Sequence, residues 1–140
     1  MTTATAIKPD TQQRREKARR NVCVWFEIPA LDFDRACRFY EAVFETKLVR
    51  DKWADADMAV FPHEQDAVGG CIMKGEGHKP AVDGCRIALA SPVDLEIPLA
   101  RVVTAGGSIA VGKTALAPGM GYFAEFLDTE GNRVGVYSVD

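Results

Sequence analysis

The sequence repeats one pattern of elements after about 62 residues. The stretch Trp-Phe-Glu-Ile at 25–28 leads into an amphipathic run at 34–44, and the stretch Ile-Ala-Leu-Ala at 87–90 leads into a second run at 95–103. Each half then ends in an extended pair in which a phenylalanine lies nine positions before a glycine, Phe61 before Gly70 and Phe126 before Gly135. Repeated units bury their apolar faces against each other, so the repetition predicts two equivalent modules in one fold.

Local signals predict the element order βαβββ in each module. A β-branched and aromatic strand at 22–28 ends before Pro29, and Asp32 can cap the helix that follows. Apolar side chains recur on one face of that helix, namely Ala36, Phe39, Tyr40, Val43 and Phe44. Further strands are expected at 47–52, 58–61, 70–74, 85–90, 108–111, 122–127 and 133–139, with a helix capped by Asp94 and a last hairpin turn at 128–132.

This order predicts an α+β fold. The two modules should pair into a curved, partly open mixed sheet around a central concave pocket, with the helices outside. We expect a basic N-terminal extension and one domain made of two modules and a linker, with the bounds 1–21 for the extension, 22–139 for the domain, 22–74 for module one, 75–84 for the linker and 85–139 for module two. The composition, 47% hydrophobic and 26% charged, is typical of one globular domain.

Charge is distributed unevenly along the chain. Residues 1–20 carry six basic and two acidic residues, which gives +4, whereas the remainder carries 11 and 18, which gives −7. A single basic cluster on an acidic body favours contact with that body or with a partner subunit over nucleic acid. No apolar run approaches the ~18 residues of a membrane span, so a cytoplasmic location is expected. Four widely spaced cysteines are interpreted as free thiols, Cys23, Cys37, Cys71 and Cys85.

Four motifs resemble the vicinal oxygen chelate superfamily, which includes glyoxalases, bleomycin-resistance proteins and extradiol dioxygenases. They are Phe-Glu-Ile-Pro at 26–29, Asp-Arg-Ala at 34–36, Phe-Tyr-Glu-Ala-Val-Phe at 39–44 and Asp-Thr-Glu-Gly-Asn-Arg at 128–133. Gly-Gly at 106–107 and the glycine-rich stretch 119–124 further resemble a subgroup of small lyase-like proteins. The resemblance covers about residues 22–139 and implies catalysis by a divalent metal that binds two vicinal oxygens.

The resemblance also implies four metal-ligand positions, one on the first and one on the last strand of each module. In this sequence they hold Trp25 and Gly70 in module one, and Ile87 and Gly135 in module two. None of these side chains binds a hard cation. We therefore expect no cofactor and no conventional metal site; a divalent metal would need a site elsewhere.

Alternation of side chains along the strands predicts which residues face the pocket. The expected ligand-binding residues are Trp25, Phe123, Arg133 and Tyr137, and the candidate catalytic groups are the carboxylates Glu27 and Glu125. Trp25 either stacks on a planar ligand or fills the pocket. Glu27 is either a general base, an anchor for a ligand, or the structural partner of an arginine such as Arg133 or Arg86. If Glu27 and Glu125 converge, they could share a proton or bind a displaced metal. The histidines His63 and His78 are expected in solvated loops.

Two functions compete for the pocket. The favoured one is a glyoxalase/bleomycin-resistance-like protein that binds a small organic molecule, because the usual metal-ligand positions are vacant. The alternative is a lyase- or isomerase-type enzyme acting on a small oxygenated metabolite, with Glu27 as base or with a displaced metal site. We expect a homodimer without membrane contact, and the basic arm could hold its two subunits together.

Overall fold

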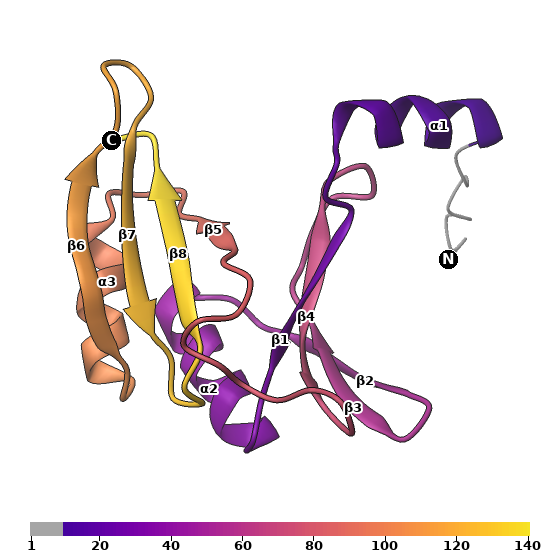
Figure 1. The fold of residues 1–140 in the computed structure, drawn as a ribbon, viewed down its shortest axis with the longest axis horizontal. Coiled ribbons are helices and arrows are strands. Elements are labelled where there is room, and N and C mark those ends of the chain that lie inside the picture. Colours follow the sequence, from indigo (N-terminus) through magenta and orange to yellow (C-terminus); the bar gives the residue numbers. More distant parts are fainter. Residues whose placement is uncertain (1–9) are drawn as a thin grey trace, which may run out of the picture.

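The computed structural model describes residues 10–140 and contains two βαβββ modules (Figure 1). A helix, α1 (Thr11–Arg20), precedes them. Module one comprises β1 (Trp25–Pro29), α2 (Phe33–Phe44), β2 (Val49–Trp53), β3 (Ala56–Val60) and β4 (Gly69–Lys74). Module two comprises β5 (Ala88–Ala90), α3 (Glu96–Thr104), β6 (Ser108–Ala115), β7 (Tyr122–Leu127) and β8 (Arg133–Ser138). The predicted modules are therefore present.

Each module forms a four-stranded mixed sheet of the same topology. The strand orders are β1-β4-β3-β2 in sheet one and β5-β8-β7-β6 in sheet two. In both sheets the first strand runs parallel to the last, and the other pairs are antiparallel. The predicted α+β class is confirmed, although the strands are hydrogen-bonded in two open sheets rather than in one.

Several strands begin or end away from the predicted positions. β1 starts at Trp25, where it meets Gly69 of β4, and β5 starts at Ala88, where it meets Gly135 of β8. The residues before Trp25 and before Ala88 have no partner in a neighbouring strand. Cys23 and Cys85 consequently lie outside the strands in which they were expected.

The amphipathic helix α2 forms as its sequence predicts. Asp32 accepts a hydrogen bond from the Arg35 backbone N–H at 3.1 Å, and the helix ends where Glu45 adopts a left-handed conformation with φ 46°. Its apolar stripe is buried, including Ala36, Phe39, Tyr40 and Val43. No helix among residues 10–140 is both long and apolar enough to cross a membrane.

Aromatic side chains from both modules pack around α2. The ring of Tyr40 lies 5.8 Å from that of Phe61 in module one and 6.2 Å from that of Phe126 in module two. Phe39 packs against Phe126 at 5.8 Å. Since burying one such side chain contributes roughly 1.5–3 kcal/mol, this cluster is a large share of the core. The repeated phenylalanines thus meet on one helix, which joins the two modules.

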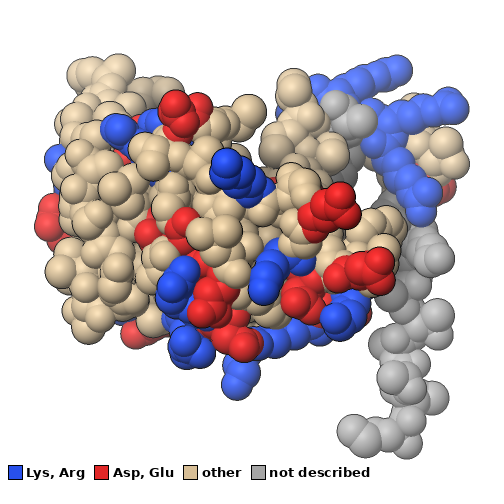
Figure 2. All heavy atoms as spheres, turned by 60° about the horizontal axis from the view of Figure 1, so that its bottom comes forward, with Lys and Arg blue, Asp and Glu red and all other residues tan. Residues whose placement is uncertain are grey.

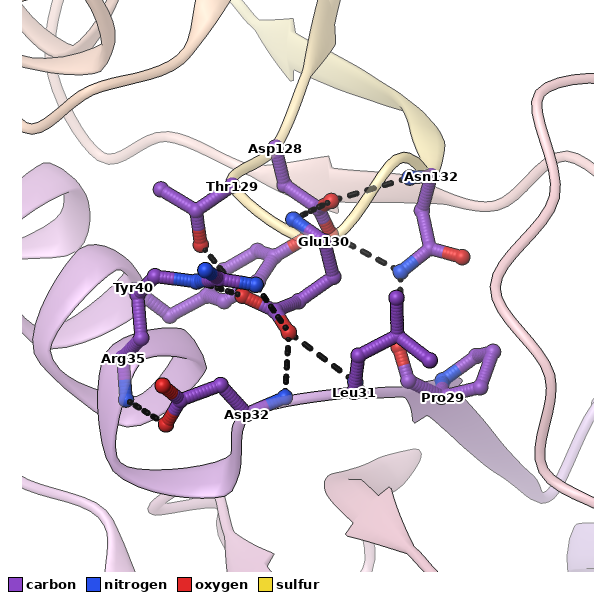
Figure 3. A network of polar contacts seen from close by, with 9 residues as sticks. All are labelled: Pro29, Leu31, Asp32, Arg35, Tyr40, Asp128, Thr129, Glu130 and Asn132. Atoms are coloured by element: carbon purple, nitrogen blue, oxygen red, sulfur yellow. Dashed lines mark hydrogen bonds and ion pairs between the residues drawn. The ribbon is translucent and has the colours of Figure 1, made fainter.

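The last hairpin turn, 128–132, joins the modules through polar contacts at the N-terminus of α2 (Figure 3). The carboxylate of Glu130 accepts hydrogen bonds from the backbone N–H groups of Leu31 and Asp32, at 2.9 and 2.7 Å. The Arg35 guanidinium donates to the same carboxylate at 2.8 Å. Because the Glu130 side chain is fully shielded from solvent, these donors replace water around a buried charge.

Asp128 and Asn132 complete this contact. The Tyr40 hydroxyl donates to Asp128 at 2.6 Å, and Asn132 donates its amide N–H to the carbonyl of Pro29 at 2.8 Å. Asp128 also accepts the backbone N–H groups of Glu130 and Asn132, so the turn is held in shape. We call Asp128, Glu130 and Asn132, with their partners in module one, the module clasp. The sequence predicted the turn but not this role.

The N-terminal helix α1 forms within the predicted basic extension. Its described basic side chains, Arg14, Arg15, Arg19 and Arg20, are exposed. The helix lies beyond the start of β1 and apart from sheet two (Figure 1). The part of the extension at residues 1–9 lies outside the described residues.

Replacing Glu130 should destabilise the protein much more than replacing a carboxylate in an exposed ion pair. Glu130→Ala leaves the Leu31 and Asp32 N–H groups without an acceptor, so we expect a loss of about 3 kcal/mol in the free energy of unfolding. Asp57→Asn breaks the exposed pair with Lys52 and should cost less than about 1 kcal/mol. Urea denaturation of both variants measures this difference. Equal losses would show that the clasp does not hold the modules together.

The clasp should also make stability depend on pH. Burial raises the pKa of Glu130, but hydrogen bonds from Arg35 and the Asp32 N–H outweigh it and bring the pKa below its ordinary value of 4.5. A carboxyl with a lowered folded-state pKa stabilises the protein above the unfolded pKa, and this stability is lost as pH falls through the folded value. The unfolding free energy of the wild type should therefore fall more steeply below about pH 4.5 than that of Glu130→Gln. Parallel pH curves would contradict this.

Candidate functional site

The face of each sheet that points away from the helices carries most of the predicted site residues. We call it the open face. On sheet one, Trp25 and Glu27 of β1 share this face, opposite the helix-side residues Phe26 and Ile28. On sheet two, Glu125 of β7 faces the same way as its neighbour Gly135 of β8. The alternation used to predict the pocket therefore holds for these strands.

Trp25 is accompanied by a histidine. The indole is 40% exposed, and the ring of His63 meets it edge-on with 6.0 Å between ring centroids. His63 lies over Gly69, where an added Cβ would come within 2.7 Å of the imidazole. Gly69 thus leaves the space in which His63 packs beside Trp25. The loop position of His63 alone did not indicate this contact.

Glu27 is paired with a histidine rather than with an arginine. Its carboxylate lies 3.1 Å from Nε2 of His78, which comes from the linker between the modules. Of the alternatives that the sequence left open, a structural pairing of Glu27 with Arg86 or Arg133 does not occur, because both arginines bind Glu125. The other imidazole nitrogen, Nδ1, is shielded from solvent and has no hydrogen-bond partner in the structure. With 42% of its side chain exposed, Glu27 is not the buried carboxylate that its strand suggested.

The two arginines instead bind Glu125. Arg133 Nε donates to this carboxylate at 2.6 Å and Arg86 Nη1 at 2.8 Å. Burial raises the pKa of Glu125, whose side chain is only 15% exposed, but the two arginines outweigh burial and lower it. Glu125 therefore stays ionised near neutral pH. No hydrogen bond joins Glu125 to Glu27, although both residues are described, so the two carboxylates have separate partners.

A cleft of about 370 Å³ lies between β1 and the start of β8. We call it the intermodule cleft. Its walls include Trp25, Glu27, Lys79, Asn132 and Arg133. Phe123 and Tyr137 lie outside these walls: they are paired further along sheet two, where the Tyr137 hydroxyl donates to the Met120 carbonyl at 2.9 Å. The structure therefore brings together only part of the predicted ligand-binding set.

Two of the four cysteines also line this cleft. Cys23 and Cys85 are exposed there, each two residues before a predicted metal-ligand position. Cys37 and Cys71 are buried in α2 and β4, and burial raises the pKa of each thiol to about 11. The buried pair acts as small apolar side chains, as predicted.

A larger hollow of about 710 Å³ lies near the N-terminus of α2. Four of its charged side chains form two ion pairs, Arg50 with Asp34 and Lys52 with Asp57. Figure 2 shows acidic and basic side chains interleaved over the face it presents. Because these ion pairs are exposed to solvent, we regard this hollow as a solvated surface rather than a binding site.

The four implied metal-ligand positions do not share one face. Trp25 and Gly135 lie on the open faces, but a Cβ at Gly70 would overlap the ring of Phe26 on the helix side. Ile87 packs against the core, and its neighbour Arg86 reaches the open face instead. The metal-ligand position that the resemblance implies at Gly70 therefore faces the core rather than the open face.

The metal that the resemblance implies does not fit these residues. None of the four positions offers a donor for a hard cation. Among residues 10–140, no three side chains of His, Cys, Asp or Glu come together in a way that would hold a metal ion.

Comparison with known proteins identifies the family. A model of the Glyoxalase/Bleomycin resistance protein/Dioxygenase superfamily matches residues 23–136. The chain therefore belongs to this superfamily. No curated protein matches the sequence.

Solved structures of the superfamily share the fold. An antibiotic-binding protein from Streptomyces sp. CB03234, TnmS3, matches with a TM-score of 0.62 and 19% identity, over 84% of this chain and 95% of that one. A glyoxylase/bleomycin resistance protein/dioxygenase domain from Frankia sp. EAN1pec matches with a TM-score of 0.63 and 16% identity, over 82% and 94%. A glyoxalase I mutant from Zea mays matches with a TM-score of 0.61 and 20% identity, over 83% of this chain but 45% of that one.

The opposite placement of two glycines can be tested by adding a methyl group to each. Gly70→Ala forces the Phe26 ring, which packs on Phe61, to move, so we expect a loss of about 1–3 kcal/mol in unfolding free energy. Gly135→Ala meets the Ile87 carbonyl at 3.1 Å and the Ala88 side chain at 3.3 Å, tight contacts without overlap, and should cost less, about 1 kcal/mol. Urea denaturation compares the two; the reverse order would place Gly70 on the open face.

Proposed function

We propose that this protein binds a small organic molecule in the intermodule cleft through its own side chains. The observation that carries the proposal is Trp25, whose partly exposed indole forms part of the cleft wall at one of the family's implied metal-ligand positions. An exposed aromatic ring beside fixed polar groups is the usual composition of a ligand site. The antibiotic-binding protein TnmS3 supports the proposal as a precedent on the same fold.

We further propose that the protein acts as a homodimer. The open face of sheet one carries exposed apolar side chains, among them Val49 and Trp53 on the outer strand β2. Exposed apolar patches of this kind mark interaction surfaces. Within the described residues, β1 and β5 are each hydrogen-bonded along one edge only. A second copy that covers these surfaces would also enclose the cleft.

A lyase- or isomerase-type activity is the second candidate, and the Glu27–His78 pair is the observation that favours it. A carboxylate that accepts a hydrogen bond from one imidazole nitrogen leaves the other nitrogen free to take a proton. His78 Nδ1 is without a partner in the structure. For this nitrogen to meet a substrate, the linker at 75–84 would have to move.

Ligand binding can be followed through the two tryptophans of the chain. In Trp53→Phe, Trp25 is the sole tryptophan, and its emission should change when a compound from a library of small aromatic molecules binds. In Trp25→Phe the remaining Trp53 should report no change with the same compound. Trp25→Ala should weaken binding by about tenfold, as expected for loss of a stacking contact. Compounds that bind equally well without the Trp25 indole would exclude the cleft as their site.

A further inference from the structure

The intermodule cleft gathers positive charge on a protein whose body is acidic. The chain from residue 21 onward carries a net charge of −7, from 11 basic and 18 acidic residues. On the cleft wall, however, the cations Lys79 and Arg133 stand against the carboxylate of Glu27. Two cations and one carboxylate leave one net positive charge on this wall. Local charge of the opposite sign to the body points to an anionic ligand.

Arg133 is held in place by a carboxylate that it shares. Its Nε and Nη2 both bind Glu125 Oε2, while Arg86 Nη1 binds Oε1 of the same group. A guanidinium has five N–H donors, and these contacts use only part of them. Arg133 lines the cleft with its remaining donors already oriented. Because its rotamer is set before a ligand arrives, binding an anion there loses little side-chain entropy.

Lys79 is the second cation on the cleft wall. It is exposed, and within residues 10–140 it forms no ion pair of its own. Its linker is anchored on both sides, by His78 on Glu27 and by the Ala81 N–H, which donates to Asn132 Oδ1 at 3.2 Å. The Glu27 carboxylate is bonded to His78 and forms no ion pair with Lys79 in the structure, so the Lys79 ammonium remains available to a ligand.

We propose that the cleft binds a planar aromatic carboxylate, with its ring on Trp25 and its carboxylate between Lys79 and Arg133. This rests on the proposed ligand-binding function and specifies its chemical class. The indole supplies a flat apolar surface, and the cleft volume of about 370 Å³ suits a small molecule. Guanidinium groups match carboxylates in geometry, and the charge-assisted hydrogen bonds they form are stronger than neutral ones. A cationic ligand of the same shape would lie against two positive side chains.

Three probes of one shape and different charge test this inference. They are 2-naphthoate, the neutral 2-naphthamide and the cationic 2-naphthylmethylammonium, and their dissociation constants are measured by calorimetry near pH 7.5 in dilute buffer. We expect naphthoate to bind about tenfold tighter than the amide and the cation to bind most weakly. Raising salt to about 0.5 M should weaken naphthoate more than the amide.

Charge-matched variants locate the effect. Lys79→Gln should weaken naphthoate about five- to tenfold and change the amide less than about twofold. Lys47→Gln, which removes a charge from the exposed loop after α2, should change neither. A Lys79→Gln variant that binds naphthoate as tightly as the wild type would overturn the inference.

The outcomes separate the ligand class from the function itself. Equal binding of naphthoate and the amide, both dependent on Trp25, would overturn the anionic class and leave the small-molecule function standing. Tightest binding of the cationic probe would likewise overturn the anionic class and leave the small-molecule function standing. If none of the probes binds while library compounds bind through Trp25, the planar carboxylate is the wrong class. If nothing binds through Trp25, the proposed function fails with it.

Discussion

The buried carboxylate of Glu130 is the interaction on which the arrangement of the two modules depends. It belongs to module two, but its hydrogen-bond donors are the Leu31 and Asp32 N–H groups and the Arg35 side chain of module one. A buried charge is tolerated only where such donors surround it. The contact therefore specifies one relative position of the modules, with the turn against the start of α2 (Figure 3).

The clasp also determines what the cleft between the modules contains. Asn132 connects the carbonyl of Pro29, at the end of β1, with the linker at Ala81. The next residue, Arg133, begins β8 and lines the cleft opposite Trp25. A residue of the module clasp, Asn132, is thus followed directly by a residue of the cleft wall, Arg133. A change in the clasp would move Arg133 and the linker together, so the stability of the fold and the shape of the cleft are physically coupled here.

Sequence reasoning succeeded where a pattern repeats over many residues. The repetition and the helical stripe on α2 predicted the modules, and alternation placed Trp25 and Glu27 on one face. Sequence reasoning failed where the exact register of a strand decides which face a residue occupies, because a shift of one residue moves a side chain to the other face of a sheet. Counting nine positions back from Gly70 and Gly135 made them equivalent, yet one faces the core and the other the open face. His78 reaches Glu27 through a loop, and no periodicity describes such a contact.

The central claim is that this member of the superfamily binds its ligand through side chains rather than through the metal that its relatives' chemistry implies. The most direct test is the metal content of the purified protein, together with thermal unfolding of chelator-treated samples titrated with Mg, Mn, Fe, Ni, Co and Zn. We expect no stoichiometric metal and no increase in the unfolding temperature with any of these ions. A bound metal at one per chain, or clear stabilisation by one ion, would contradict this and direct attention to Glu27 and His78.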